Sequence, residues 1–466
     1  MDERLYSRPL DVHRISEYPE VQRMITYLFD EMKSSGLIGK SPKDKILKHL
    51  KVVVLDLYIA YLSDPLIYLG YPRGKDYYSK DSRLGQLFLR YRPMMRVVDG
   101  LLSLEYLESR KGFQDQATGS SYFSRMRATP KLIDLIENYS VAPSMISLED
   151  DQLIILRDAD KVDIDYDGTD ETSAMEATLR SYNAFLSKYE LALSLSTEDV
   201  RDLLQSRRSP PIDYTRIRLY RIFNEDFTSG GRFYRGWWQN IPRELRQHIT
   251  IDGEACSELD YSGQHLLLLY DLEGDEYSWL RGLNNDPYSL DDYGEDVRDL
   301  LKRSVLILVN SSNETQAIRA IREKINYEFP YLDSTDVYIR SLIEALTDKH
   351  PEIEDHLFSG RGGELQHQDS QIAEYVLKDM LARGQPVLPV HDSFIVQDKF
   401  IAHLYSSMKE AYRMLGIDSI PDVKQKLGAN TDRTQASFRM LNKLIKKNAS
   451  EKRKEINSIK EWGRRI

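Results

Sequence analysis

Hydrophobic positions follow helical or strand-like spacing in distinct regions of the chain. Residues 1 to about 147 have the period of helices joined by short turns, and this period returns from about 172 to 400 with short apolar runs of strand length. The segment 149–171 holds ten acidic residues and predicts a solvated linker or loop. After Gly428 the chain is polar and then basic. We therefore predict a helical N-terminal domain over 1–147, an acidic linker or loop over 148–174, a main domain over 175–430 and a basic helical tail over 431–466.

Composition places the chain among folded, non-membrane proteins. Its 466 residues fit two or three domains, and 41% hydrophobic with 30% charged residues favours a buried core. No apolar run approaches the roughly 18–20 residues of a membrane span, since the run Val52–Leu62 is interrupted by Asp56. The first ten residues lack the apolar core of a signal peptide. A single cysteine, Cys256, excludes a disulfide framework and a multi-cysteine zinc site. We expect a cytoplasmic protein with no membrane partner.

The charge distribution is uneven. A net charge of −10 argues against non-specific coating of nucleic acid, but it leaves room for a local basic channel. Residues 441–466 hold nine Lys and Arg against three Glu. This tail fits either a segment that grips a nucleic-acid template or a charge-rich terminal helix.

The N-terminal region contains a pattern typical of a winged helix-turn-helix. A helix over Leu87–Leu102 is followed by a strand over Tyr106–Phe113, a turn over Gln114–Ser121 and a second strand over Tyr122–Thr129. Cations gather on the hairpin and around the start of the helix: Arg110, Lys111, Arg125 and Arg127, with Arg90, Arg92 and Arg96. Arg110, Arg125 and Arg127 are therefore candidate DNA-phosphate contacts. A solvated basic hairpin or a protein-docking module explains the same pattern equally well.

The acidic segment has part of a calcium-binding pattern. Asp163, Asp165, Asp167 and Gly168 occupy positions 1, 3, 5 and 6 of an EF-hand loop. Position 12 needs a bidentate glutamate, and this chain has Ala174 there. We predict a solvated acidic loop and no calcium site.

Two aspartates at predicted strand ends are candidate metal ligands. Asp260 ends a predicted strand that enters a helix, and Asp392 lies in a predicted hairpin turn between the runs Val387–Val390 and Phe394–Val396. Two such aspartates can hold a pair of divalent metals, about 3.5–4 Å apart, that activate a hydroxyl and stabilise a leaving pyrophosphate. An aspartate beside a strand is more often a simple turn residue.

A basic helix between the two aspartates strengthens the metal interpretation. Residues 298–305 predict a helix, on which Arg298 and Lys302 are four residues apart and share a face. Two cations on one face can neutralise a triphosphate as pyrophosphate leaves. The same pair could also be a solvated face that pairs with Glu295 or Asp299.

The ordered set of motifs resembles the family A DNA polymerases and the phage-type single-subunit RNA polymerases. Five segments carry the resemblance over about residues 175–400: Gly231-Arg232 with Gln239-Asn240-Ile241-Pro242, ELDYSGQH at 258–265 (motif A), RDLLKRSV at 298–305 (motif B), His367-Gln368-Asp369-Ser370, and PVHDSF at 389–394 (motif C). The resemblance implies a helix-rich α+β fold, a right-hand polymerase palm and fingers with a small antiparallel palm sheet, preceded by the helical N-terminal domain.

The resemblance also implies roles for individual residues. Asp260 and Asp392, with the backbone carbonyl of Tyr261, would hold two Mg²⁺ ions, and Mn²⁺ would also serve. Arg298 and Lys302 would bind the triphosphate, with Lys302 as proton donor to pyrophosphate. The residues implied on the nucleic-acid side, which would contact a DNA template and primer, are Arg232, Gln239, Gln368 and His391. Nucleoside triphosphates would be the other partner.

Two positions depart from the family pattern. The motif B helix normally carries an aromatic residue eight positions after the lysine, and here that residue is Asn310. Family A DNA polymerases carry a glutamate five residues after the motif A aspartate, which excludes a ribose 2′-hydroxyl, and here that residue is His265. Both residues belong to the implied nucleotide site, and both leave the choice between dNTP and NTP open.

Two functional hypotheses follow. The first is a template-directed nucleotidyltransferase that adds nucleotides to a 3′-hydroxyl, by analogy in the replication or transcription of a mobile element or phage. The second is a non-catalytic, DNA-binding replication initiator or regulator with a degenerate polymerase-like domain. Retention of Asp260, Asp392, Arg298 and Lys302 together favours the first, whereas Asn310 favours the second.

Overall fold

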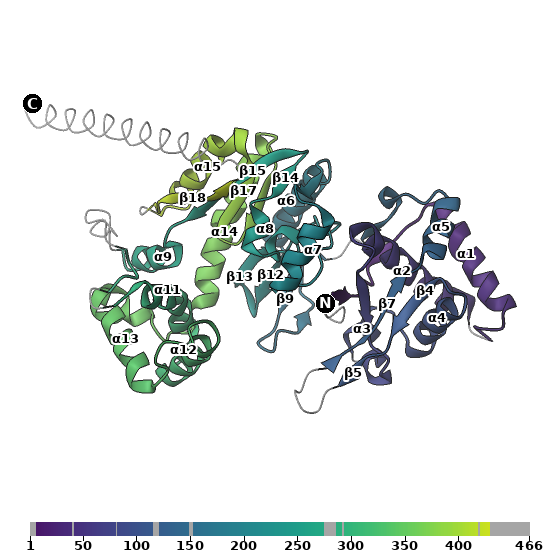
Figure 1. Cartoon of the computed structure of the whole chain (residues 1–466). Coiled ribbons are helices and arrows are strands. Elements are labelled where there is room, and N and C mark those ends of the chain that lie inside the picture. The colour runs from purple at the N-terminus through teal and green to yellow at the C-terminus, as the bar shows by residue number, and fades with distance from the viewer. Residues whose placement is uncertain are drawn as a thin grey trace, which may run out of the picture. The chain divides into compact units, whose positions relative to one another are not determined.

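The computed structural model describes residues 6–39, 42–80, 82–114, 121–148, 152–274, 286–290, 293–417 and 420–428. The chain forms two compact units, unit 1 (Met1–Gln152 and Leu195–Arg216) and unit 2 (Leu153–Ser194 and Ile217–Ile466). Figure 1 shows the many helices and the small sheets, so the helix-rich α+β class predicted from the sequence is confirmed. The predicted tail over 431–466 lies outside the described residues. No helix within the described ranges is long and apolar enough to cross a membrane.

Unit 1 combines helices with a four-stranded sheet. The helices are α1 (Pro19–Ser34), α2 (Lys43–Ser63), α3 (Arg83–Leu87), α4 (Tyr91–Ser103), α5 (Pro130–Asn138) and α7 (Thr197–Ser206). The sheet has the order β1 (Ser7–Pro9), β3 (Tyr68–Tyr71), β7 (Ser124–Ala128), β4 (Leu107–Arg110). Two further strand pairs are β2 (Arg14–Ile15) with β8 (Ser147–Leu148), and β5 (Phe113–Gln114) with β6 (Ser121–Tyr122). The predicted helix and two strands are present in shorter form, as α4, β4 and β7, and β4 pairs antiparallel with β7. Most of the turn predicted over Gln114–Ser121 lies outside the described residues.

The helix predicted over Leu87–Leu102 begins later than expected. The structure ends α3 at Leu87 and starts α4 at Tyr91. Pro93 explains the difference, because proline has no N–H for an intrahelical bond and is tolerated only in the first helical turn. Arg92 and Arg96 are then exposed, one helical turn apart on α4.

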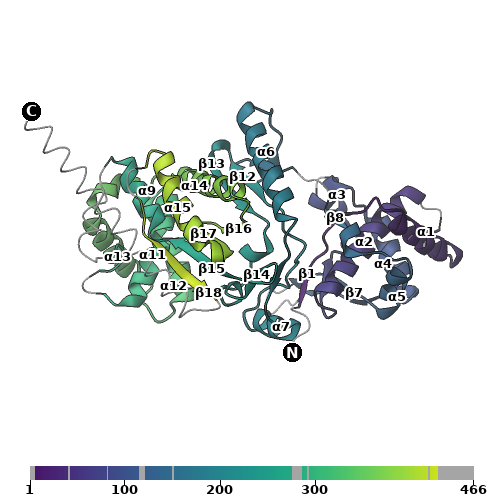
Figure 2. The ribbon, with the colours of Figure 1, turned by 90° about the horizontal axis from the view of Figure 1, so that it is seen from above.

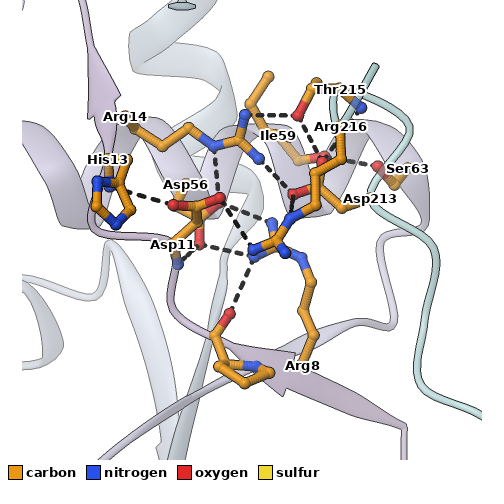
Figure 3. A network of polar contacts seen from close by, with 11 residues as sticks. Arg8, Asp11, His13, Arg14, Asp56, Ile59, Ser63, Asp213, Thr215 and Arg216 are labelled. Atoms are coloured by element: carbon orange, nitrogen blue, oxygen red, sulfur yellow. Dashed lines mark hydrogen bonds and ion pairs between the residues drawn. The ribbon is translucent and has the colours of Figure 1, made fainter. Parts of the chain in front are cut away.

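A buried ion-pair network centres on Asp56, the charge that interrupts the apolar run of α2. Arg8 donates to both carboxylate oxygens of Asp56 (2.7 and 2.8 Å), and Arg14 Nε donates to Oδ1 (3.1 Å), as Figure 3 shows. Arg14 also donates to Asp213 (2.6 Å), which belongs to the returning segment 195–216. This network ties the N-terminal strands, α2 and the returning segment together within unit 1.

The acidic segment predicted as a linker contributes structure to unit 2. β9 (Ile154–Arg157) pairs parallel with β12 (Tyr220–Asn224) and antiparallel with β10 (Asp163–Ile164), and β13 (Asp226–Tyr234) completes the sheet. The prediction of a linker or loop is therefore wrong for the first part of the segment, because Leu153, Ile154 and Leu156 are buried there and β9 belongs to a sheet. After β10, α6 (Asp170–Leu186) begins at the capping residue Thr169.

The main sheet of unit 2 is antiparallel throughout. Its order is β11 (Leu191–Leu193), β14 (Ile249–Ile251), β15 (Glu254–Tyr261), β17 (Ser393–Gln397), β16 (Val387–Val390), and β18 (Val423–Gly428) also pairs with β15. Figure 2 shows β18 beside β15. Helices α14 (Gly362–Ala382) and α15 (Ile401–Met414) pack on each other, α14 against β16 and α15 against β15 and β17.

The remaining elements of unit 2 are mostly helical. They are η3 (Trp237–Gln239), α8 (Arg243–Arg246), α9 (Gln264–Leu272), α11 (Glu295–Asn310), α12 (Glu314–Glu328), α13 (Asp336–Lys349) and η4 (Pro351–His356). Helix α11 packs against α12 and α14, and α12 packs against α13. Figure 1 shows α11, α12 and α13 as one helical group. The helix predicted over 298–305 is the middle of α11.

Candidate active site

Two aspartates lie at the same end of neighbouring strands. Asp260 on β15 is the register partner of Ser393 on β17, and Asp392 directly precedes Ser393. The backbone N–H of Tyr261 donates to the carbonyl oxygen of Asp392 over 3.4 Å. The structure therefore brings together the two carboxylates that the sequence predicted to meet.

A tight turn presents Asp392. Residues His391 and Asp392 form the two-residue connection between β16 and β17, where Val390 pairs with Ser393. His391 has φ +56°, a left-handed conformation that is uncommon for residues other than glycine. Its exposed ring meets the ring of Tyr234 edge-on, with the centroids 6.2 Å apart. Strained residues of this kind cluster at functional sites.

Asp260 sits in an environment that disfavours its charge. Its exposed fraction is 8%, and burial together with the charge of Asp392 raises its pKa to about 6. The charges of Lys426 and Lys302 act in the opposite direction. Two carboxylates crowded this closely carry excess negative charge that a cation would neutralise.

The donors at this end of the sheet fit a hard divalent cation. Carboxylates and carbonyls are the oxygen ligands that Mg²⁺ prefers, and it usually keeps waters and substrate phosphates as its other ligands. Tyr261 can offer only its backbone, because its buried hydroxyl donates to the carbonyl of Met408. Within the described residues no group of three or more His, Cys, Asp or Glu side chains could hold a metal. A metal here would depend on Asp260, Asp392, backbone and substrate oxygens.

The two cations on the basic face of α11 differ, because Arg298 is paired with carboxylates and Lys302 is exposed. Arg298 Nε donates to Asp286 over 2.9 Å, and Nη1 donates to Asp299 over 2.8 Å. Lys302 is exposed, and its charge lowers the pKa of Asp260. Lys302 is thus electrostatically linked to the carboxylates, whereas Arg298 would have to exchange its carboxylate partners for a phosphate.

Asn310 lies at the C-terminal end of α11. Eight residues separate it from Lys302, about 12 Å along the helix axis. Its Nδ2 donates to the carbonyl of Leu306, and the side chain packs so closely on Gly362 that a Cβ there would overlap it. No described contact joins Asn310 to the two aspartates, although it was predicted to share their nucleotide site.

Arg232 joins three elements through a buried carboxylate. Its Nε donates to Asp369 Oδ2 on α14 over 2.8 Å, and His265 Nε2 on α9 lies 3.3 Å from the same oxygen. Arg232 and His265 also contact each other over 3.0 Å. Burial alone would raise the pKa of Asp369, but the hydrogen bonds and charges of His265 and Arg232 hold it below its usual value. Arg232 and His265 thus hold β13, α9 and α14 together.

A glycine allows β13 to approach α14. Gly231 has φ +84°, and a Cβ there would lie 2.6 Å from the ring of Phe223 and 2.9 Å from Ser370 Oγ. Its carbonyl accepts from Arg221 Nε over 2.6 Å, and Arg221 Nη2 donates to Ser370 over 3.1 Å. Gly231 of the Gly-Arg pair is therefore required by backbone conformation and close packing.

Gln239 forms hydrogen bonds that position the motif C hairpin. Its Nε2 donates to the carbonyl oxygens of Phe233 (2.9 Å) and Pro389 (3.1 Å), and its Oε1 accepts from the N–H of Gly236 (3.1 Å). Trp238 Nε1 donates to the same Pro389 carbonyl over 2.9 Å. Gln239, predicted as a nucleic-acid contact, is occupied with positioning the hairpin that carries Asp392.

The start of α14 carries buried polar atoms with open hydrogen-bonding capacity. Gln368 Oε1, His367 Nδ1 and Asp369 Oδ1 are buried and have no hydrogen-bond partner among the described residues. Buried polar groups nearly always find partners. These atoms lie in the segment that the sequence predicted to face a template and primer.

The three arginines predicted on the hairpin of unit 1 differ in environment. Arg110 and Arg127 both stack over the ring of Tyr68, and Arg127 forms an ion pair with Glu108. Arg125 is 3% exposed, so its guanidinium does not lie on the surface where a DNA phosphate would reach it. The prediction that Arg125 contacts DNA is not supported by this position.

Sequence reasoning missed two residues at the carboxylate pair. Lys426 on β18 places Nζ 2.7 Å from Asp260 Oδ1. Glu258, two residues before Asp260, is 3% exposed and pairs with Arg246 over 3.0 Å. The signal in the sequence was the alternation of Glu258 and Asp260 on either side of Leu259, at the end of strand β15.

Comparisons with known proteins give structural matches but no sequence match. No family model matches the sequence, and no curated protein matches it. Among solved structures the chain is similar to the POL domain of Pol1 from M. smegmatis in complex with DNA primer-template and dNTP, with a TM-score of 0.33 and 11% sequence identity. The match covers 90% of this chain and 66% of that chain, slightly less than two thirds. A match of this strength assigns the chain neither a fold family nor an activity.

Proposed function

We propose that unit 2 is a template-directed nucleotidyltransferase that adds nucleotides to a 3′-hydroxyl. The observation that carries this proposal is the pair of Asp260 and Asp392 at the ends of two neighbouring strands, with the pKa of Asp260 raised to about 6. Crowded carboxylates facing a basic helix are suited to hold divalent cations and a triphosphate.

Asp260, Asp392 and the carbonyl of Tyr261 are the groups that would hold Mg²⁺, two ions in all, or Mn²⁺. Bound metal would lower the pKa of the attacking hydroxyl and neutralise charge on the leaving pyrophosphate. The protein contributes the rigid β15 and β17 ladder, which fixes the separation of the two carboxylates while nucleotides come and go.

Lys302 and Arg298 would act on the triphosphate. The Lys302 ammonium is exposed, and its charge lowers the pKa of Asp260, so we assign it the role of giving a proton to the leaving pyrophosphate. Arg298 would bind the phosphates by exchanging Asp286 and Asp299 for them, since guanidinium groups pair with either anion in the same bidentate geometry.

DNA template and primer would lie along the start of α14 and the motif C turn. His391 is exposed beside Asp392, and Gln368 retains a buried, unpaired acceptor. Arg232 would act mainly by holding Asp369, and Gln239 by holding the hairpin. His265, which contacts Arg232, stands where the related DNA polymerases carry the 2′-hydroxyl-excluding glutamate, so dNTP and NTP are both candidate substrates.

For unit 1 we propose a winged helix that binds duplex DNA. The order α2, β3, α3, α4, β4, β7 and the pairing of β7 with both β3 and β4 support this proposal. Arg92 and Arg96 on α4, together with Lys111, are exposed and would meet phosphates.

The deciding experiment is extension of a labelled primer on a DNA template with Mg²⁺ or Mn²⁺, comparing dNTPs with NTPs. Asp260→Ala is the loss variant, and Asp271→Ala, which changes an acidic residue of α9 instead of β15, is the matched control. Extension by the wild type and Asp271→Ala, but not by Asp260→Ala, is the expected result. Tight DNA binding with no extension by either nucleotide set would favour the non-catalytic initiator.

A further inference from the structure

Strand β18 delivers a lysine directly to the carboxylate pair. β18 pairs antiparallel with β15 over Ser257 to Tyr261. Lys426 Nζ lies 2.7 Å from Asp260 Oδ1 and 3.8 Å from Glu258 Oε1, and 27% of its side chain is exposed. Within the described part of the chain, this is the one ion pair that Asp260 forms.

Glu258 has its own partners and does not depend on Lys426. Arg246 Nε donates to Glu258 Oε2 over 3.0 Å, and Ser393 Oγ donates to Oε1 over 2.7 Å. The Lys426 ammonium therefore lies between two carboxylates. Glu258 already has other partners, whereas the negative charge of Asp260 is disfavoured by Asp392 and favoured by Lys426. Because the Lys426 side chain is partly exposed, its ammonium can shift over the short distance between Asp260 and Glu258.

A lysine ammonium and a metal ion compete for the same oxygen. Mg²⁺ binds oxygen at about 2.0–2.1 Å. With the ammonium 2.7 Å from Asp260 Oδ1, a metal on that oxygen would stand within about 5 Å of a second positive charge. The repulsion at that distance remains strong even at an effective dielectric constant of about 20.

We infer that Lys426 is a displaceable counter-ion of Asp260, which occupies the carboxylate in the metal-free protein and moves towards Glu258 when a divalent cation binds. This inference rests on the proposed function, because it takes Asp260 as a metal ligand. Lys426 keeps the affinity for a lone divalent cation low, so that the site fills when the anionic triphosphate arrives and offsets the extra positive charge.

The test is Mn²⁺ binding to the full chain without nucleotide, measured by the electron paramagnetic resonance signal of free Mn²⁺. We expect Lys426→Met to bind Mn²⁺ at least about tenfold more tightly than the wild type, whereas Lys426→Arg keeps the wild-type affinity. Lys399→Met is the matched control, because it removes the same charge just beyond the end of β17 that is farthest from Ser393, the register partner of Asp260, and its affinity should change by less than about threefold. Thermal melts with and without Mn²⁺ give a second readout, in which Lys426→Met shows the larger metal-dependent shift.

The alternative outcomes separate this inference from the proposed function. Equal tightening in Lys426→Met and Lys399→Met would reveal a general charge effect and overturn the inference. No tightening in Lys426→Met, while Asp260→Asn and Asp392→Asn still lose Mn²⁺, would overturn the inference and leave the metal site intact. Mn²⁺ binding that is unchanged by Asp260→Asn and Asp392→Asn would overturn both.

Discussion

Asp260 and Asp392 reach the same end of one antiparallel sheet because Asp260 is in register with Ser393, the residue that follows Asp392. The backbone hydrogen bond from Tyr261 to the Asp392 carbonyl extends this pairing one residue further. A shift of one residue would turn one carboxylate to the other face of the sheet, so the register itself decides whether the two can act together.

Asp392→Asn should abolish nucleotide addition and leave DNA binding nearly intact. The amide has almost the same shape as the carboxylate, but it removes the negative charge that would hold a metal. We expect a loss of at least about 10³-fold in primer extension. DNA affinity, measured by fluorescence anisotropy, should stay within about twofold of the wild type. Retained extension would rule out Asp392 as a metal ligand.

Asp260→Asn should stabilise the metal-free protein at neutral pH. The pKa of Asp260 is about 6 in the folded protein, above the usual aspartate value, so the folded state holds this proton more tightly than the unfolded state. Ionisation of Asp260 therefore lowers the free energy of unfolding. This effect grows as the pH rises from about 4 to above 6, and it has reached its full size at neutral pH. We expect the variant to gain about 1–3 kcal/mol in the free energy of unfolding at about pH 7.5, and little at about pH 4.5.

The measurement is urea unfolding in the presence of a chelator at both pH values. An equal gain for Asp260→Asn at both values would mean that the effect does not come from the ionised carboxylate.

Lys302→Ala should lower the rate of nucleotide addition by about 10²–10³-fold, because the variant has no ammonium next to the carboxylates on the leaving-group side. Arg303→Ala is the matched control on the same helix, since Arg303 is engaged with Glu328 and the ring of Phe329. Single-turnover extension at saturating nucleotide measures both. Equal losses in the two variants would point to disruption of α11 and away from catalysis by Lys302.

Asp56→Asn should destabilise unit 1 strongly, because it leaves Arg8 and Arg14 buried without the carboxylate that both of them contact. Breaking a buried ion pair from one side costs about 3–5 kcal/mol. Asp99→Asn, which breaks the exposed pair with Arg73, should cost less than about 1 kcal/mol. Urea unfolding of the full chain gives both values, and similar small effects would show that the network of Figure 3 contributes little.

Replacing both Arg92 and Arg96 with alanine should weaken binding to duplex DNA of any sequence. Each arginine that neutralises a phosphate contributes about 1 to the slope of log affinity against log salt, so the slope of the double variant should be shallower by about 2. Binding titrations at several salt concentrations measure the slope. An unchanged slope would exclude this face of α4 as the DNA-binding surface.

Much of the local structure could be predicted from sequence because it depends on neighbours along the chain. The strand before Asp260, the hairpin around Asp392 and the helix with Arg298 and Lys302 are all present where the sequence placed them. Apolar runs, turn residues and helical spacing report directly on such elements. The two aspartates predicted at strand ends lie at the same end of the sheet, whereas Asn310, predicted for the same site, has its described contacts with Leu306 and Gly362.

The tertiary structure alone decided which charged groups meet. Lys426 is 166 residues from Asp260 in sequence, and only the pairing of β18 with β15 makes it a partner of the carboxylate. Arg232 and Gln239 were predicted as nucleic-acid contacts, yet packing against α14 and the motif C hairpin gives their side chains internal partners. The acidic segment likewise became part of a sheet because β12, more than 60 residues later, pairs with it. Sequence patterns encode local propensity and burial, whereas long-range strand pairing selects the neighbours that set charge and hydrogen bonding at the site.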